Sequence, residues 1–309
     1  MSLNEAYPPM LSLSPSPRQI FSTLLPHLRV AAAYAKEIQN RVVEQPEKAY
    51  PGNFFASALT DADLSVQTFV EVLLLAYFPQ IRFYGEEHER TFNTKYFPGI
   101  EFPGSEGSGS SDLLLTLDPI DGTRCYADGF DNYQIILNVL SPEQFEGCLL
   151  ISPARDRYFC TLRGAGVLEG RLSDALEQCR PIGALPQNHT IYLGGGAGIF
   201  AQALPDRYVA YDVYTEYSHQ EQRPSMVDFF DGAYGGAILK RANFLDGAAM
   251  AFMAQEWGCI VSDHQGQPLP PLRSCTHWAW PGLVIATSPE MHRDLLQAVQ
   301  AVEHNSREN

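Results

Sequence analysis

The chain has 309 residues, 45% of them hydrophobic, and its formal net charge is −15. This composition is typical of a soluble globular protein, and the length suits one large α/β domain or two closely packed lobes. No basic stripe is present, so we expect neither nucleic acid nor an anionic membrane as a partner. The longest apolar stretch, residues 69–78, contains Glu71 and is too short to span a membrane.

The amino-terminal segment is rich in proline and serine but lacks the basic and apolar regions of a signal peptide. We therefore predict a disordered segment over residues 1–16 and a cytoplasmic location. The six cysteines show no CxxC pair and no regular spacing, which favours reduced thiols over a disulfide framework or a zinc site.

The first predicted helix covers residues 17–45, where apolar residues recur at helical spacing, and Pro26 should break or kink it. A second helix is expected at residues 64–77, followed by a short strand at 81–84. The segment 88–111, which ends in a glycine- and serine-rich run, is predicted to be a flap near the functional site or a tolerated insertion.

The remaining elements alternate irregularly between strands and helices. Strands are predicted at residues 113–118, 132–140, 147–152, 157–162, 190–193, 208–214 and 283–286, and helices at residues 225–230, 245–257 and 289–302. This irregular order favours a layered α/β (α+β) fold with mixed sheets over a purely parallel one. We expect residues 17–309 to form a single domain.

The most informative stretch is an apolar run that ends in Asp118-Pro119-Ile120-Asp121-Gly122-Thr123. Because proline favours an extended residue before it and donates no ladder hydrogen bond, the strand should end at Asp118. Residues three apart in a strand point to opposite faces, so only a turn should bring Asp118 and Asp121 together. With the Ile120 carbonyl exposed between them, they would offer three oxygen ligands suited to Mg²⁺.

Gly122 and Thr123 follow directly, and backbone N–H groups at the start of a helix favour an anion. A cation site beside an anion site predicts metal-assisted phosphate chemistry. The alternative is purely structural, because Asp-Pro and Asp-Gly pairs are ordinary turn formers.

Three further acidic residues lie at the ends of predicted elements. Asp63 follows Thr60 at a helix start, Glu86 follows a strand and a glycine, and Asp246 opens a helix rich in small residues. Each has a structural alternative: a capping box for Thr60 and Asp63, a solvated pair for Glu86 and Glu87, and a helix-dipole contact for Asp246.

Together these motifs resemble the inositol monophosphatase superfamily of Mg²⁺-dependent, lithium-sensitive phosphatases. The resemblance covers about residues 54–302, with a weak middle third. It rests on Thr60-x-x-Asp63, Gly85-Glu86-Glu87, the intact signature Asp118 to Thr123, Leu245-Asp246-Gly247-Ala248-Ala249, and residues 256–266. It implies a layered αβαβα sandwich with mixed β-sheets and the homodimer usual in the family. A metal-binding lobe would cover about 17–180, and a substrate-side lobe would cover 181–309.

The resemblance also implies the metal ligands. Glu86, Asp118 and the Ile120 carbonyl would hold one Mg²⁺. Asp118, Asp121 and Asp246 would hold a second. A third ion, held mostly by water, would be linked to Glu86.

The remaining roles implied by the resemblance concern the reaction. Thr123, paired with Asp63, would orient the metal-bound water that attacks phosphorus, and no covalent phosphoenzyme would form. The substrate would be a small phosphorylated metabolite, a monoester of an inositol, a sugar or a nucleotide.

The substrate side departs from the family pattern. Inositol phosphatases carry an acidic residue about seven positions before the late aspartate, whereas this chain has Leu239 followed by Lys240 and Arg241. The basic pair could meet a second anionic group of the substrate, or it could be an ordinary surface pair. The glycine run 194–198 predicts a substrate-side loop with Gly195 near a phosphate, although the full G-x-G-x-x-G pattern is missing.

Two other interpretations remain. In a haloacid-dehalogenase-like phosphatase Asp118 would be a covalent nucleophile, but Ile120 occupies the place of the second aspartate that such enzymes need. A degenerate family member would bind a metal or ligand without turnover. The substrate-side departures favour that alternative, and the retained Thr123 and Asp63 oppose it.

Overall fold

The computed structural model describes residues 15–42, 59–98 and 113–308. Almost all of the segment 1–16 that we predict to be disordered, and the glycine-rich end of segment 88–111, lie outside the described residues. Within those three ranges, no helix combines the length and the hydrophobicity that a membrane span requires.

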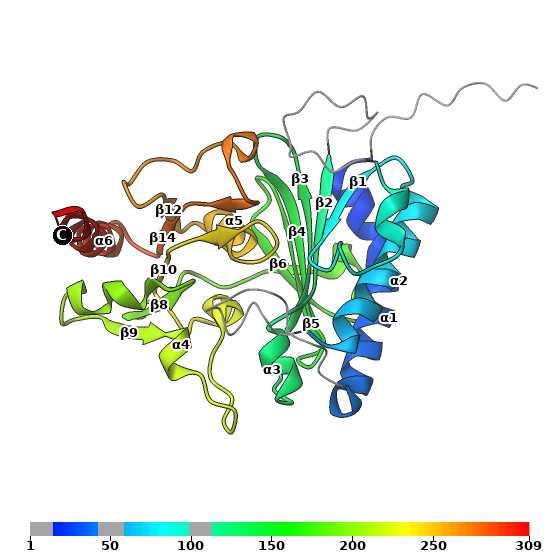
Figure 1. Cartoon of the computed structure of the whole chain (residues 1–309), viewed down its shortest axis with the longest axis horizontal. Helices are drawn as coiled ribbons and strands as arrows, with labels where there is room; N and C mark the ends of the chain where they lie inside the picture. The colour runs from blue at the N-terminus through cyan, green and yellow to red at the C-terminus, as the bar shows by residue number, and fades with distance from the viewer. Residues whose placement is uncertain (1–14, 43–58, 99–112, 309) are drawn as a thin grey trace, which may run out of the picture.

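Five layers of alternating helices and sheets make up the described chain (Figure 1). Helices α1 (Pro17–Ile38) and α2 (Asp61–Tyr77) cover one face of a seven-stranded sheet. Helix α5 (Gly247–Trp257) lies between this sheet and a five-stranded sheet, and α6 (Pro289–Glu308) covers the far face of the second sheet. The predicted αβαβα sandwich with mixed sheets is confirmed.

The strands of the seven-stranded sheet lie in the order in which they occur along the chain. Its first two strands are parallel and all other neighbours are antiparallel. The strands are β1 (Arg82–Gly85), β2 (Leu114–Asp121), β3 (Gln134–Leu140), β4 (Phe145–Ser152), β5 (Arg157–Leu162), β6 (Val167–Arg171) and β7 (Arg180–Pro181). The parallel pair matters most, because it places the carboxyl ends of β1 and β2 side by side.

The second sheet is mixed and has the order β12-β14-β10-β8-β9. Strands β8 (Thr190–Gly194), β9 (Val209–Asp212) and β10 (Gly236–Leu239) are parallel. Strand β14 (Leu283–Ala286) is antiparallel to β10, and β12 (Ile260–Ser262) is antiparallel to β14. Strands β11 (Ala242–Asn243) and β13 (Ala279–Trp280) form a separate pair.

Short helices connect these elements. They are α3 (Thr123–Ala127), α4 (Val213–Glu216) and the 3₁₀ helices η1 (Gln39–Arg41), η2 (Asn93–Tyr96), η3 (Leu176–Gln178), η4 (Ala197–Ala203), η5 (Met226–Asp231) and η6 (Leu272–Ser274). Helix η4 packs with α6 on the outer face of the second sheet, and η5 packs against α5 in the central layer.

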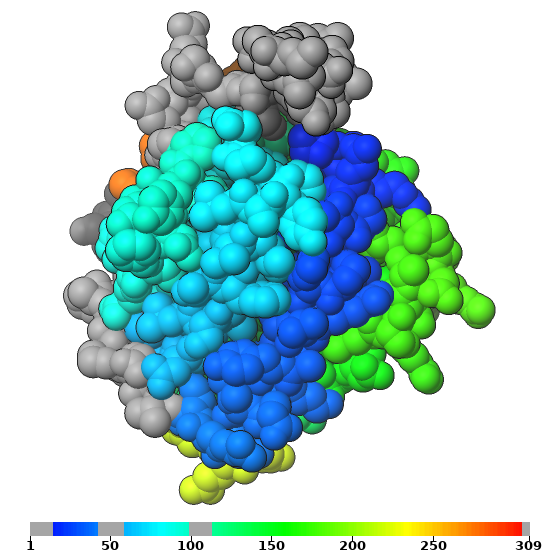
Figure 2. Space-filling model, turned by 90° about the vertical axis from the view of Figure 1, so that its right-hand side faces the viewer, coloured from blue at the N-terminus to red at the C-terminus, as the bar shows by residue number. Residues whose placement is uncertain are grey.

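Helices α1 and α2 pack side by side over the outer face of the first sheet (Figure 2). Helix α1 begins in a capping box at Ser16 and ends at Ile38, before the predicted end at residue 45, and it continues through Pro26 without the break that was one of the two predicted effects. Pro26 is exposed, whereas Leu25 and Leu28 are buried. Packing of the buried face holds the helix together, and Ser22, whose carbonyl loses its helical partner at Pro26, is exposed.

Three apolar cores correspond to the three interfaces between layers. One lies between the first sheet and helices α1 and α2, a second surrounds α5 between the two sheets, and a third lies beneath α6 and η4. Helix α5 is buried from Ala248 to Ala254, as expected for a helix enclosed by two sheets.

Candidate active site

Glu86 and Asp118 lie next to each other because β1 and β2 are parallel and in register. Gly85 pairs with Leu117, and the N–H of Glu86 donates a hydrogen bond of 2.9 Å to the Leu117 carbonyl. Glu86, which follows the last residue of β1, therefore lies beside Asp118 of β2. Functional groups gather at the carboxyl ends of strands in α/β proteins.

A bulge in β2 brings the two carboxylates of the central motif together. Asp118 pairs with Ile136 and Asp121 pairs with Gln134, so β2 has one more residue than β3 over this interval. The extra residue shifts the alternation of side chains, which lets Asp118 and Asp121 face the same site. The prediction that the strand ends at Asp118 and turns is therefore wrong, because β2 continues through Pro119 to Asp121.

Asp246 reaches the same site from the central layer. It is the N-cap residue of α5, and its carboxylate accepts a hydrogen bond from the N–H of Gly247. Asp118, Asp121 and Asp246 each offer a carboxylate oxygen, and these oxygens lie within 4.8 Å of one another. Asp246 is therefore both a helix cap and a member of an acidic cluster assembled from two layers.

Burial and mutual repulsion change the acidity of this cluster. Burial, followed by the charges of Asp246 and Glu86, raises the pKa of Asp121 to about 8. Burial also raises the pKa of Asp246 to about 6, although the hydrogen bond from Gly247 opposes the shift. A divalent cation would relieve this repulsion, and an all-oxygen set of carboxylates suits Mg²⁺. The residues present therefore fit the ion that the sequence predicts.

Asp63 serves as a helix cap and as the partner of Thr123 at the same time. Its Oδ2 accepts hydrogen bonds from the N–H of Thr60 at 2.9 Å and from the Thr60 hydroxyl at 2.6 Å. Its Oδ1 lies 3.0 Å from the hydroxyl of Thr123. The capping box proposed as the structural alternative is real, and it leaves one carboxylate oxygen for the site.

The Thr123 hydroxyl also lies 2.9 Å from the carbonyl of Ile120, so two acceptors flank it. Thr123 is 7% exposed and Asp63 is fully buried. A hydroxyl that donates its proton to a buried carboxylate keeps its own lone pairs for another donor, such as a water molecule.

Glu87 belongs to a second acidic group that we did not expect. Asp63, Glu86 and Glu87 offer carboxylate oxygens within 4.8 Å of one another. Glu87 is only 1% exposed, so the interpretation of Glu86 and Glu87 as a solvated pair is wrong for Glu87. The N–H of Glu87 donates to the side-chain oxygen of Gln67 at 2.8 Å, which ties this segment to α2.

Gly122 links the bulge to helix α3. Its φ of +84° is in the left-handed region, and an added Cβ would lie 3.0 Å from the backbone oxygen of Asn132. Both features require glycine here. The N–H groups of Gly122 and Thr123 stay predicted phosphate contacts.

Gly195, Lys240 and Arg241 come together at the carboxyl ends of two parallel strands of the second sheet. Gly194 pairs with Leu239, and a Cβ added to Gly195 would lie 3.1 Å from the Arg241 carbonyl oxygen. The two basic residues are exposed. Burial is the main influence on the pKa of Asp246, and the charge of Arg241 acts against it. Arg241 therefore lies close enough for its charge to act on Asp246.

Tyrosines form part of the surroundings that sequence reasoning missed. The pKa of Tyr192 lies well above its usual value, first because of burial and then because of the charges of Asp121 and Asp246 among others. Its ring packs against Tyr211 and Tyr234, with centroids 6.3 and 5.2 Å away. No local signal marks these residues, since only the arrangement of the second sheet brings them to the site.

The model of the inositol monophosphatase family matches residues 24–304. The chain belongs to the inositol monophosphatase family. Among curated relatives, a Neisseria meningitidis serogroup B protein named "Putative Nus factor SuhB" is 25% identical over 207 residues, which cover 65% of this chain and 74% of that protein.

Solved structures of the inositol monophosphatase fold agree with this assignment. A Thermotoga maritima IMPase superposes with a TM-score of 0.66 at 18% identity, covering 93% of this chain and 98% of that one. An IMPase/NADP phosphatase complexed with Mg²⁺ and phosphate superposes with a TM-score of 0.63 at 16% identity, covering 91% and 95%. Family membership also opposes the haloacid-dehalogenase-like alternative, whose resemblance was limited to the motif at Asp118–Thr123.

Proposed function

We propose that this protein is a Mg²⁺-dependent phosphatase that hydrolyses a small phosphate monoester by direct attack of water. The observation that carries the proposal is the meeting of Asp118, Asp121 and Asp246 within 4.8 Å beside the hydrogen-bonded pair of Thr123 and Asp63. A binding protein without turnover has no need of that second pair, whereas water attack does. Membership of the inositol monophosphatase family supports the same reaction class.

The proposed metal ligands are those implied by the sequence. Glu86, Asp118 and the Ile120 carbonyl form one set, and Asp118, Asp121 and Asp246 form the other. Glu86 also belongs to the acidic group with Asp63 and Glu87, and a third ion would be linked to it there. When bound, Mg²⁺ would neutralise the carboxylates, acidify a coordinated water and offset the charge of the phosphoryl oxygens.

The chain's own groups would then align the reactants. The Asp63 carboxylate accepts a hydrogen bond from the Thr123 hydroxyl, and the Thr123 oxygen would accept one from the attacking water. The N–H groups of Gly122 and Thr123 would hold phosphoryl oxygens, and Gly195 would lie on the substrate side. Because the donor–acceptor pair is buried and preorganised, little reorganisation is needed during the reaction.

The substrate we favour carries a second anionic group. Lys240 and Arg241 follow Leu239, the position where the family pattern has an acid for sugar hydroxyls, and the charge of Arg241 acts on Asp246. A solved IMPase/NADP phosphatase is bound with D-inositol-1-phosphate, so related folds accept a phosphorylated polyol. In this chain the basic pair would favour a bisphosphate, because its charge complements an additional phosphate. We further propose a cytoplasmic homodimer.

The decisive experiment is phosphate release from a panel of esters with Mg²⁺, with EDTA, and with Mg²⁺ plus lithium. The panel comprises inositol phosphates, fructose and sedoheptulose bisphosphates, 3′-phosphoadenosine 5′-phosphate and histidinol phosphate. We expect release from at least one ester, suppression by EDTA and lithium, and loss of activity in Asp118→Asn. Absence of release from every ester would support the degenerate alternative. A phosphoaspartate at Asp118 in a mass spectrum would overturn water attack.

A further inference from the structure

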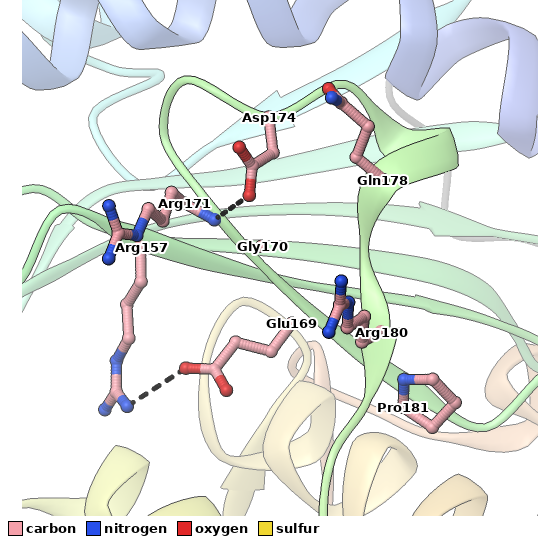
Figure 3. A pocket seen from close by; sticks show the side chains of 8 residues that line it. All are labelled: Arg157, Glu169, Gly170, Arg171, Asp174, Gln178, Arg180 and Pro181. Carbon is pink, nitrogen blue, oxygen red and sulfur yellow. Dashed lines mark hydrogen bonds and ion pairs between the residues drawn. The ribbon is translucent and has the colours of Figure 1, made fainter.

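A pocket of about 520 Å³ lies at the opposite edge of the first sheet from the acidic cluster. The cluster is built on β1 and β2, whereas β5, β6 and β7 carry the pocket. Three arginines line it, Arg157, Arg171 and Arg180, and Figure 3 shows them arranged around Gly170. Its volume is in the range of small-molecule sites.

The strand register places two of these arginines directly opposite each other. Arg157 of β5 pairs with Arg171 of β6 in the antiparallel ladder. Side chains that are directly opposite share a face, and like charges in such a pair destabilise the sheet. A negative charge near either of them reduces this cost.

Arg157 is compensated by Glu169 of the pocket and by Asp231 outside its lining. Glu169 also lies directly opposite Arg180 in the ladder of β6 and β7. Arg157 lies 3.3 Å from Glu169 and 2.7 Å from Asp231. Asp174 accepts hydrogen bonds from the backbone N–H of Arg171 and from the Ser173 hydroxyl instead. Within the described residues, the guanidinium groups of Arg171 and Arg180 have neither an ion pair nor a hydrogen bond.

An unpaired guanidinium on a convex surface would be unremarkable, because water satisfies it. Here the unpaired guanidinium groups of Arg171 and Arg180 line one pocket together with Arg157. The net charge of the whole protein is −15, so such a gathering of arginines is unusual. Guanidinium groups bind phosphate through paired N–H donors, and several around one cavity favour several phosphates. The volume of about 520 Å³ limits the ligand to a compact molecule.

We propose that this pocket binds a compact small molecule with two or more phosphate groups, held by Arg171 and Arg180 beside Arg157. Arg157 already pairs with Glu169 and Asp231. The site is separate from the acidic cluster and does not depend on the proposed phosphatase activity. Its acids would accept hydrogen bonds from hydroxyl groups of the same ligand.

The test is calorimetric titration of the full-length chain with inorganic tripolyphosphate in EDTA. EDTA removes divalent cations, so the uncompensated carboxylates of the acidic cluster repel the probe. We expect saturable binding that is at least about tenfold tighter than that of inorganic phosphate, because more charge-assisted hydrogen bonds form. The double variant Arg171→Gln/Arg180→Gln should weaken tripolyphosphate binding by at least about tenfold.

The matched control is Arg41→Gln/Arg293→Gln, which removes the same charge from two exposed arginines elsewhere. It should change the dissociation constant by less than about twofold. Equal losses in both double variants would show a general charge effect and overturn the site, as would a wild-type chain without saturable binding. Thermal unfolding without ligand checks that Arg171→Gln/Arg180→Gln is folded, and Arg180→Gln alone provides a milder variant.

Discussion

The hydroxyl of Thr123 lies 3.0 Å from Oδ1 of Asp63, while Oδ2 of the same carboxylate accepts two hydrogen bonds from Thr60. One buried side chain thus closes the first turn of α2 and holds the proposed water-orienting hydroxyl. Oδ2 caps the helix and Oδ1 holds the Thr123 hydroxyl, so substitutions can test the two roles separately.

Asp63→Asn should lower kcat by about 10²–10⁴-fold, because a neutral amide is a poorer acceptor for the Thr123 proton. Its effect on unfolding should be small. Thr60→Val removes the capping hydroxyl and should cost about 1 kcal/mol of stability while leaving kcat within about threefold. Steady-state kinetics and urea denaturation of both variants check the separation. Equal kinetic losses would mean that Asp63 acts only through the helix cap.

Thr123→Val should reduce kcat by about 10²-fold or more and leave KM nearly unchanged, because the hydroxyl would act on the water and not on the bound ester. Thr123→Ser keeps the hydroxyl and is the matched control, with kcat within about tenfold of the wild type. A valine variant that retains full activity would exclude Thr123 from water orientation.

Stability without divalent cations should fall as the pH rises. The folded-state pKa values of Asp121, about 8, and Asp246, about 6, lie above the ordinary value near 3.8. The folded protein therefore holds protons that the unfolded chain releases between pH 4 and 8. The stability tied to these protons is fully present below pH 4 and is lost as the pH rises through 6 and then 8.

Denaturation in EDTA at pH 5, 6.5 and 8 measures this dependence, with a slope of up to about 1.4 kcal/mol per pH unit for each carboxylate. Asp121→Asn should flatten the upper part of the curve. Mg²⁺ should reverse the trend, because ion binding requires deprotonated carboxylates and strengthens with pH. A pH-independent curve in EDTA would contradict the burial and repulsion described for this cluster.

Lys240→Gln should raise KM for a bisphosphate substrate by about tenfold and change KM for a comparable monophosphate by less than about twofold. The exposed Arg41→Gln serves as the control for net charge. If the KM for both esters rises equally in Lys240→Gln, the residue contributes only general attraction and does not recognise a second phosphate.

Gly122→Ala should destabilise the protein and lower its activity, because it combines a left-handed backbone with a contact of 3.0 Å to the Asn132 oxygen. Gly129 is a matched control, since its φ is +80° and an added Cβ would meet nothing within 4 Å. Gly129→Ala should cost about 1 kcal/mol and Gly122→Ala about 2–4 kcal/mol. Similar denaturation midpoints for both variants would show that the contact is unimportant.

Local patterns mark Asp118, Asp121 and Asp246 as candidates, because each lies where an apolar element begins or ends. Each also has a structural alternative, and the resemblance to the family is what predicts them as metal ligands. The tertiary structure was needed to show that β2 continues through Pro119, since a bulge is defined only by the partner strand. Pairing with β3 outweighed the local preference of proline for ending a strand.

Strand β10 and Tyr192 depend on contacts between residues far apart in the chain, which a short stretch of sequence does not show. Strand β10 begins at Gly236, directly after Gly235. A Cβ added to Gly235 would collide with the backbone of Asn188, so this position requires glycine. Glycine is unfavourable in strands, and the sequence therefore gives no strand signal here. Tyr192 becomes part of the site only because β8 faces the acidic cluster. The sequence by itself determined which residues could carry metal and phosphate chemistry, because their side chains are fixed by type and local position. Only the tertiary structure decided which of them meet, because their contacts join residues far apart in the chain.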